Sequence, residues 1–194
     1  MPKSGQLIYL MGASGAGKDS LIRYARQHLG NQSSILFTTR YITRPHVDPE
    51  NETHLPVSPY EFNVLQKNGT LAMHWRRNGI DYGIDKEINS WLEKGKIVVI
   101  NGSRQYLSLA LEDYPDIHVI LVKANQDLLL KRLQTRGRET PEKIEERMKQ
   151  ANTFLKLEDQ NSRFTIIENN NSLKTAGDKF LELLQAHLSS DPIL

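Results

Sequence analysis

Residues 6–22 read Gln6-Leu-Ile-Tyr-Leu-Met-Gly-Ala-Ser-Gly-Ala-Gly-Lys-Asp-Ser-Leu-Ile22. The apolar run 7–11 predicts a short buried strand, and Lys18 begins a pattern that is typical of an amphipathic helix. Between them, Gly12 and Gly17-Lys18 have the spacing of a phosphate-binding loop, Gly-x-x-x-x-Gly-Lys. Glycines let the backbone turn its N–H groups towards an anion, and the helix N-terminus adds partial positive charge. The stretch therefore predicts a site for nucleotide phosphates.

The residue after Lys18 departs from this motif. A Ser or Thr usually follows the lysine and binds Mg²⁺ through its hydroxyl, but here Asp19 follows and Ser20 comes next. A carboxylate is a hard, charged ligand for magnesium, so either Asp19 or Ser20 is the expected metal ligand, and we favour Asp19. The expected phosphate and metal site comprises Gly12, Ala13, Ser14, Gly15, Ala16, Gly17, Lys18, Asp19 and Ser20. The alternative is a Gly-rich strand-to-helix turn that binds no ligand.

The composition limits the classes of protein to consider. The chain has 194 residues, 38% of them hydrophobic and 25% charged, which is typical of a soluble globular domain. A net charge of +2 does not indicate nucleic-acid binding, and no apolar run of about 18 residues predicts a membrane span. The absence of cysteine excludes disulfides and thiol chemistry. No signal-peptide pattern precedes the first strand, so we expect a cytoplasmic protein; its oligomeric state is unknown.

Predicted strands alternate with predicted helices along the rest of the chain. Continuous apolar runs at 97–100 and 117–122 predict strands buried on both faces. Further strands are expected at 35–39 and 164–167, and helices at 18–29, 59–68, 85–94, 126–136, 141–155 and 172–184. Residues 45–59 hold four of the eight prolines and predict a loop. This alternation predicts an α/β fold, a parallel sheet core covered by helices on both faces.

A hairpin interrupts this alternation. The segments 71–75 and 80–82 flank Asn78-Gly79, a favoured two-residue turn. Arg76 and Arg77 precede this turn, and the sequence leaves open whether they bind phosphate or lie on the surface.

Polar residues follow the predicted strand ends, where parallel sheets bind ligands. Arg40 and Arg44 follow the strand at 35–39, and Asn101, Ser103 and Arg104 follow the one at 97–100. Arginine forks match the geometry of phosphate oxygens, so we expect an anion here.

A second basic group lies farther along the chain and comprises Arg132, Arg136, Arg138 and Arg147. Part of this group can form an ordinary solvated helix face with ion pairs. However, Arg136-Gly137-Arg138 lies at a predicted helix end, where a lid could hinge and bring arginines over a phosphoryl group.

These motifs resemble the guanylate kinase superfamily over nearly the whole chain. The resemblance is carried by the Gly-rich loop, Arg40-x-x-Thr-Arg44, Glu61-Phe62, Tyr82-Gly83, Asn101-Gly102 and Arg132-Leu-x-x-Arg136-Gly137 with Arg147. Within the superfamily, the chain is similar to the ribose 1,5-bisphosphate phosphokinases of bacterial phosphonate degradation. That similarity is carried by Gly15-x-Gly-Lys-Asp-Ser20, Glu52-x-His54, Trp75-x-x-Asn-Gly79, Val99-x-Asn-Gly-Ser-Arg104 and Arg136-Gly-Arg-Glu139.

The resemblance implies a P-loop kinase with a small acceptor-binding subdomain and a helical lid. It implies one domain, 1–194, with a core at about 1–44, 95–130 and 160–194, an acceptor-binding region at about 45–94 and a lid at about 131–159. It implies ATP and Mg²⁺ as cofactors and ribose 1,5-bisphosphate as the small-molecule substrate. The implied product is 5-phosphoribosyl 1-diphosphate.

The resemblance also implies roles for single residues. The groups expected to act on the transferring phosphoryl are Lys18, Arg132, Arg136 and Arg147, and those expected to bind the acceptor are Arg40, Arg44, His54, Tyr82, Asn101, Ser103 and Arg104. Guanylate kinases read guanine with carboxylates at about the positions of Met73 and Val99, and neither residue here is acidic. The alternatives are guanylate kinase or another small-molecule kinase, and a non-catalytic binding module, which typically lacks an intact phosphate loop.

Overall fold

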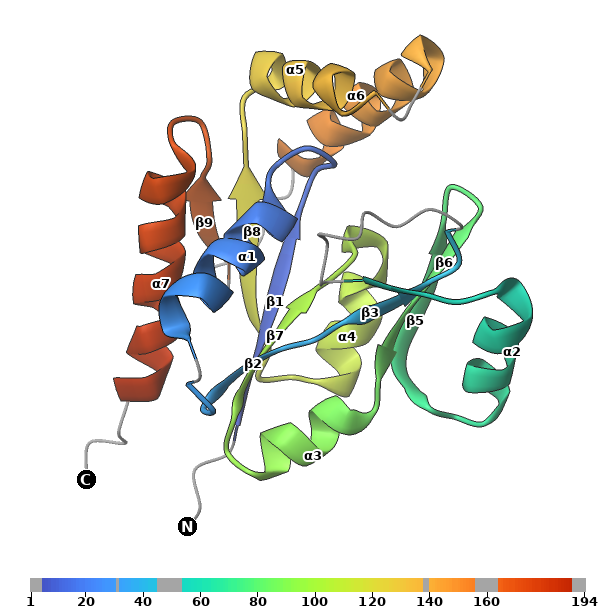
Figure 1. The fold of residues 1–194 in the computed structure, drawn as a ribbon, viewed down its shortest axis with the longest axis vertical. Helices are drawn as coiled ribbons and strands as arrows, with labels where there is room; N and C mark the ends of the chain where they lie inside the picture. The colour runs from blue at the N-terminus through green and yellow to red at the C-terminus, as the bar shows by residue number, and fades with distance from the viewer. Residues whose placement is uncertain (1–4, 31, 45–53, 138–139, 156–163, 190–194) are drawn as a thin grey trace.

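The computed structural model describes residues 5–30, 32–44, 54–137, 140–155 and 164–189, and contains two β-sheets (Figure 1). The larger sheet consists of β1 (Gln6–Gly12), β2 (Ile35–Phe37), β7 (Ile97–Asn101), β8 (His118–Lys123) and β9 (Phe164–Glu168). The smaller sheet consists of β3 (Arg40–Ile42), β4 (His54–Pro56), β5 (Leu71–Arg77) and β6 (Ile80–Asp85). The helices are α1 (Lys18–Leu29), α2 (Pro59–Lys67), α3 (Glu87–Glu93), η1 (Arg104–Tyr106), α4 (Leu107–Asp113), α5 (Gln126–Arg136), α6 (Pro141–Leu155) and α7 (Leu173–Ser189).

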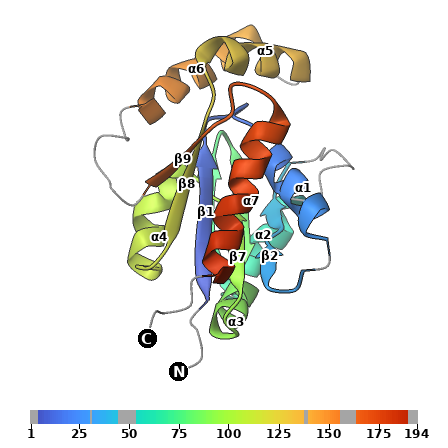
Figure 2. The same ribbon diagram turned by 90° about the vertical axis from the view of Figure 1, so that its left-hand side faces the viewer.

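The larger sheet is parallel throughout, with the strand order β2-β7-β1-β8-β9. Helices α1 and α7 cover one face and α4 covers the other (Figure 2). The predicted parallel sheet with helices on both faces is therefore confirmed. Because β1 lies at the centre, the loop after Gly12 emerges between the carboxyl ends of β7 and β8.

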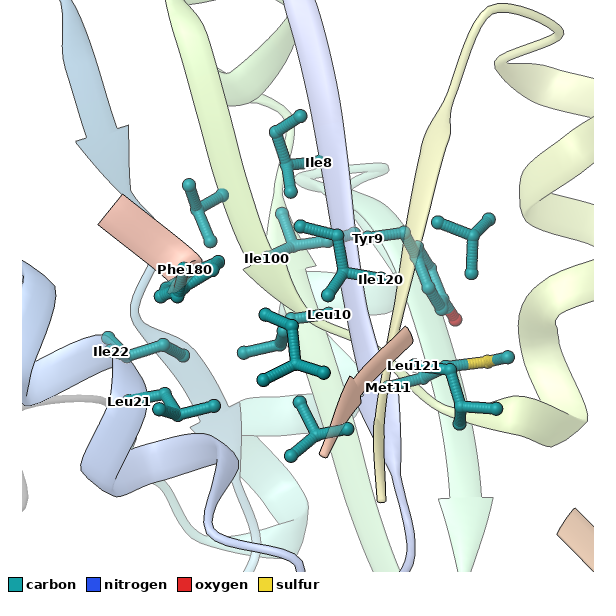
Figure 3. Packing of buried hydrophobic residues seen from close by; sticks show 14 of the residues in the cluster. Ile8, Tyr9, Leu10, Met11, Leu21, Ile22, Ile100, Ile120, Leu121 and Phe180 are labelled. Carbon is teal, nitrogen blue, oxygen red and sulfur yellow. The ribbon is translucent and has the colours of Figure 1, made fainter. Parts of the chain in front are cut away.

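The core is built on alternate faces of β1 (Figure 3). Leu10 points towards Ile22 of α1 and Phe180 of α7, whereas Tyr9 and Met11 point to the opposite face. All five side chains are at most 2% exposed. A strand buried on both faces, as in other parallel sheets, fixes the start of the phosphate loop rigidly.

The smaller sheet has the strand order β4-β3-β6-β5 and is mixed. Strand β3 pairs in parallel with β4 and antiparallel with β6, and β5 and β6 form the predicted hairpin. Its turn residues, Asn78 and Gly79, have φ angles of 51° and 75°. Positive φ at both central residues is the requirement of the turn type that Asn-Gly predicts.

Helices α5 and α6 lie above the carboxyl edge of the larger sheet (Figure 1). Asn125 caps α5 by accepting a hydrogen bond from the Leu128 N–H at 2.9 Å, and Gly137 ends the helix with φ 60°. Pro141 begins α6, as predicted. None of the helices in the described ranges has the length and apolarity that crossing a membrane would need.

Two expectations about local structure were wrong, and one helical segment was not predicted. The strand expected at 35–39 ends at Phe37, and Arg40 begins β3 of the smaller sheet. Part of the expected loop at 45–59 is β4, which gains backbone hydrogen bonds from β3; residues 45–53 lie outside the described residues. The helical segment 104–113 was not predicted, because its apolar pattern spans too few residues to distinguish a helix from a turn.

Candidate active site

The phosphate loop joins β1 to α1, as the sequence predicts. Gly15 and Gly17 have φ angles of 87° and 98°, a backbone conformation that favours glycine. A Cβ atom on Gly17 would lie 2.2 Å from Nδ2 of Asn169, so no side chain fits there. The Lys18 ammonium donates hydrogen bonds to the carbonyls of Gly12 at 2.9 Å and Ala13 at 3.1 Å. The lysine charge is thus held against the loop.

Two of the predicted lid arginines contact this loop. Arg132 of α5 donates to the carbonyls of Gly15 at 3.2 Å and Ala16 at 3.4 Å, and burial lowers its pKa. Arg147 of α6 donates to the hydroxyl of Ser14. The side chain of Arg136 and all of 138–139, and hence the predicted Arg138, lie outside the described residues.

Asn169 belongs to this site, although the sequence reasoning missed it. It follows β9 directly, is 2% exposed, and donates from Nδ2 to the Ala16 carbonyl at 2.8 Å. Its Oδ1 is buried and has no hydrogen-bond partner among the described residues. Asn169 follows the end of the last predicted strand, just as Arg104 and its neighbours follow an earlier one. Its position in the sequence could therefore have indicated it.

The guanidinium of Arg40 is the centre of a second cluster. It donates to the Asn101 carbonyl at 3.1 Å, contacts His54 Nε2 at 2.6 Å and lies 3.5 Å from the Asp19 carboxylate. Asn101 in turn donates from Nδ2 to Asp19 Oδ1 at 2.7 Å. Because a guanidinium can only donate, His54 accepts through Nε2. The cluster joins β3, β4 and β7 to the first turn of α1.

The electrostatics of the cluster depend on burial. Arg40 is 8% exposed, and burial lowers its pKa while the negative charge of Asp19 opposes that shift. A buried charge without a partner is strongly destabilising, so Asp19 stabilises the arginine in place. Even so, Nε of Arg40, Nε of Arg44 and Oδ1 of Asn101 are buried and have no hydrogen-bond partner among the described residues. Buried polar atoms are normally paired, so these atoms are suited to a polar ligand.

Two aromatic rings continue the cluster along the smaller sheet. The Tyr82 ring centre lies 5.8 Å from Cζ of Arg40, and Trp75 stacks on Tyr82 with ring centres 5.6 Å apart and planes 6° apart. Met73 is fully buried beside Ile84. Where the resemblance to guanylate kinases expects a base-reading carboxylate, the structure therefore has packed apolar side chains.

Tyr9 supports the segment that carries Asn101, Ser103 and Arg104. Its buried hydroxyl donates to the Ser103 carbonyl at 2.6 Å and accepts from the Ser103 N–H at 2.9 Å. A Cβ atom on Gly102 would lie 2.1 Å from Tyr9 Cζ, so the ring presses directly against the backbone. Burial raises the pKa of Tyr9, which keeps the hydroxyl protonated. A tyrosine within a buried strand needs a hydrogen-bond partner, which is the signal that could have identified it.

The residues available for a metal are compatible with magnesium. Among the residues that the structure describes, no group of three or more His, Cys, Asp or Glu could hold a metal ion. Magnesium, however, is usually bound by one or two protein ligands together with substrate phosphates. Asp19 and Ser20, in the first turn of α1 next to the loop, fit that pattern.

The fold and the loop define the class of this protein: it is a nucleotide-binding P-loop protein with a guanylate kinase-like fold. A family model described as AAA domain matches residues 8–154. A solved structure of guanylate kinase from Anaplasma phagocytophilum superposes with a TM-score of 0.72, covering 98% of this chain and 90% of that chain at 19% identity.

Two relatives narrow the class to a family. The protein named ribose 1,5-bisphosphate phosphokinase PhnN from Psychromonas ingrahamii is 45% identical over 95% of this chain and 92% of its own length. The protein of the same name from Thiobacillus denitrificans is 43% identical over 93% of each chain. The chain belongs to the ribose 1,5-bisphosphate phosphokinase family, whose members are named as kinases.

Proposed function

We propose that this protein transfers the γ-phosphoryl group of ATP to the 1-phosphate of ribose 1,5-bisphosphate, forming 5-phosphoribosyl 1-diphosphate. The observation that carries the proposal is the cluster around Arg40, which lies against Asp19 at the end of the phosphate loop. A phosphate held by Arg40 would lie beside the nucleotide phosphates. Its sugar would meet the amide oxygen of Asn101, which is buried and has no hydrogen-bond partner among the described residues.

The reaction needs no general base, because the attacking phosphate oxygen is already anionic at neutral pH. Catalysis then consists of positioning and charge neutralisation. Backbone N–H groups of 13–18 and the Lys18 ammonium would hold the ATP phosphates. Arg132, Arg136 and Arg147 would lie over the transferring group and exclude water that otherwise hydrolyses ATP.

The acceptor would be held mainly by arginine. Arg40 and Arg44 suit the accepting phosphate, because each has a buried Nε without a partner among the described residues. His54 and Tyr82 lie against Arg40 and would orient it. Asn101, Ser103 and Arg104 are assigned to the sugar and its substituents, as the resemblance implies.

We further propose Mg²⁺, held by Asp19 or Ser20, as the ion that neutralises the nucleotide phosphates. The chain would act as one domain, with the core, acceptor-binding region and lid divided as the resemblance implies. We also propose that the protein is cytoplasmic and that it acts in phosphonate metabolism.

Guanylate kinase is the main alternative activity. A purine needs hydrogen-bond partners for its edge, and a site without them discriminates poorly in its favour. Met73 is fully buried and offers no such group. The non-catalytic binding module is less well supported, because the loop residues and Lys18 have the geometry of a phosphate site.

A direct assay tests the proposal. The purified protein is given Mg-ATP with either ribose 1,5-bisphosphate or GMP, and ADP release is coupled to a spectroscopic signal while the products are identified by mass. We expect turnover with the sugar bisphosphate and 5-phosphoribosyl 1-diphosphate as product. Turnover with GMP instead would identify a divergent guanylate kinase, and no ATP binding at all would favour the non-catalytic module.

A further inference from the structure

Arg77 is the last residue of β5 and lies on the strand face that carries the aromatic rings. Residues 73, 75 and 77 share this face, because side chains alternate along a strand. Arg76 lies on the opposite face, 70% exposed and 3.7 Å from the Asp81 carboxylate. The guanidinium of Arg77 donates to Gln150 Oε1 of α6 at 2.8 Å. Two neighbouring arginines therefore have different surroundings, and only Arg77 faces α6.

Two further arginines lie near Arg77. Gln150 follows Arg147 by three residues on α6, so both side chains lie on one side of that helix. The segment η1, which begins with Arg104, packs on β5, and its Tyr106 ring lies 5.8 Å from Trp75. The pKa of Arg77 is lowered first by burial and then by the positive charges of Arg147 and Arg104, while Tyr82 and Glu146 partly offset this shift.

Arg77 on β5, Arg104 at the start of η1 and Arg147 on α6 make this end of the strand face positive, which suits an anionic group of a ligand. This basic group lies along the smaller sheet from the cluster around Arg40. The stacked rings of Tyr82 and Trp75 lie between the two, because Tyr82 contacts Arg40 and Trp75 is two residues from Arg77. This face of the smaller sheet therefore has positive charge at Arg40 and at Arg77, with the two stacked aromatic rings between them.

A sugar with a phosphate at each end has the matching chemistry. We propose that Arg77, together with Arg104, binds the second phosphate of the acceptor, the one that does not receive the phosphoryl group. The sugar ring then lies along Tyr82 and Trp75. The accepting phosphate belongs at the Arg40 end, because Arg40 contacts Asp19 beside the phosphate loop. This assignment of the second phosphate rests on the proposed function and specifies how its substrate is recognised.

The test compares ligands that differ by one phosphate. Dissociation constants are measured by titration calorimetry for ribose 1,5-bisphosphate, ribose 5-phosphate and ribose 1-phosphate, with wild type and Arg77→Ala. Loss of a charge-assisted contact should weaken the bisphosphate and ribose 5-phosphate about ten- to hundred-fold. Binding of ribose 1-phosphate should change less than about twofold, because its phosphate is held at the Arg40 end. Equal weakening of all three ligands would overturn the proposal.

Two control variants separate binding from structure. Arg76→Ala removes an equal charge from the exposed face of the same strand, and Gln150→Ala removes the α6 partner while Arg77 remains. Both should keep the wild-type preference for the bisphosphate over ribose 1-phosphate. If Gln150→Ala loses that preference as Arg77→Ala does, Arg77 acts by holding α6 and not by binding phosphate.

The two proposals fail in different ways. If wild type binds ribose 1,5-bisphosphate but does not phosphorylate it, the proposed reaction is wrong, and the binding series still decides the role of Arg77. If wild type turns the bisphosphate over and Arg77→Ala retains full affinity, the reaction stands and the site for the second phosphate is wrong.

Discussion

The phosphate loop and the cluster around Arg40 adjoin each other, yet they are built in different ways. The loop is one continuous segment between β1 and α1, and it offers mainly backbone N–H groups and one lysine. The Arg40 cluster brings together side chains from β3, β4, β7 and α1. One site is encoded within a few consecutive residues, and the other exists only after two sheets have packed together.

The two sites should therefore be sensitive to different kinds of substitution. A site made of backbone N–H groups is lost when a substitution prevents the required backbone conformation, even if the new side chain is chemically inert. An assembled side-chain site is vulnerable at its contacts, because its members share hydrogen bonds and charges and the loss of one affects the residues that it held. Substitutions in the loop, in the Arg40 cluster and beneath it should therefore differ in how much function they remove.

Gly17→Ala should have the largest effect, because it adds a Cβ atom 2.2 Å from Asn169 Nδ2 at a φ of 98°. Positive-φ strain and overpacking together should cost about 2–5 kcal/mol of unfolding free energy. ATP affinity, measured by calorimetry, should fall below detection. Gly79→Ala is the matched control: its φ is also positive, but nothing lies within 4 Å of the added atom. It should cost only about 1–2 kcal/mol and leave ATP affinity intact; equal losses in both variants would contradict the steric argument.

Asp19→Ala should disturb both sites, because Asp19 lies where they meet. Arg40 loses its counter-charge and Asn101 Nδ2 loses an acceptor, which should cost about 1–3 kcal/mol of unfolding free energy. We expect both the Mg²⁺ concentration for half-maximal activity and the KM for the acceptor to rise. Ser20→Ala should shift the Mg²⁺ dependence less. A larger Mg²⁺ shift in Ser20→Ala would assign the metal to the serine.

Tyr9→Phe should affect function least, because its effect should be confined to the acceptor side. The lost hydroxyl leaves the Ser103 N–H and carbonyl without their partner, at a cost of about 1–3 kcal/mol in unfolding free energy. The acceptor KM should rise a few-fold while the KM for ATP stays unchanged. Because burial raises the pKa of Tyr9, wild-type activity should show no titration of this group at or below its ordinary pKa of 10. A rise in the KM for ATP would show that Tyr9 supports the whole edge of the sheet.

Much of the fold could be predicted from local patterns. The strand–loop–helix start, the Asn78-Gly79 hairpin and the apolar runs of β7 and β8 all reflect physics that acts within a few residues. The limits of β2 and the existence of β3 and β4 could not be predicted in the same way. Three-residue strands have too little periodicity of their own and are held by hydrogen bonds to distant segments.

The sequence alone was enough to predict the phosphate loop, because turn geometry and anion binding there depend on closely spaced glycines and one lysine. It also indicated that Arg40, His54 and Asn101 bear on function. The packed structure was needed to show that Arg40 and Asn101 both contact Asp19 and that His54 contacts Arg40. It also showed that Tyr9 and Asn169 hydrogen-bond the backbone at Ser103 and Ala16, and that Arg77 and Arg76 face opposite ways. Contacts between segments distant in sequence depend on how the sheets pair and pack, and short sequence patterns do not predict this packing.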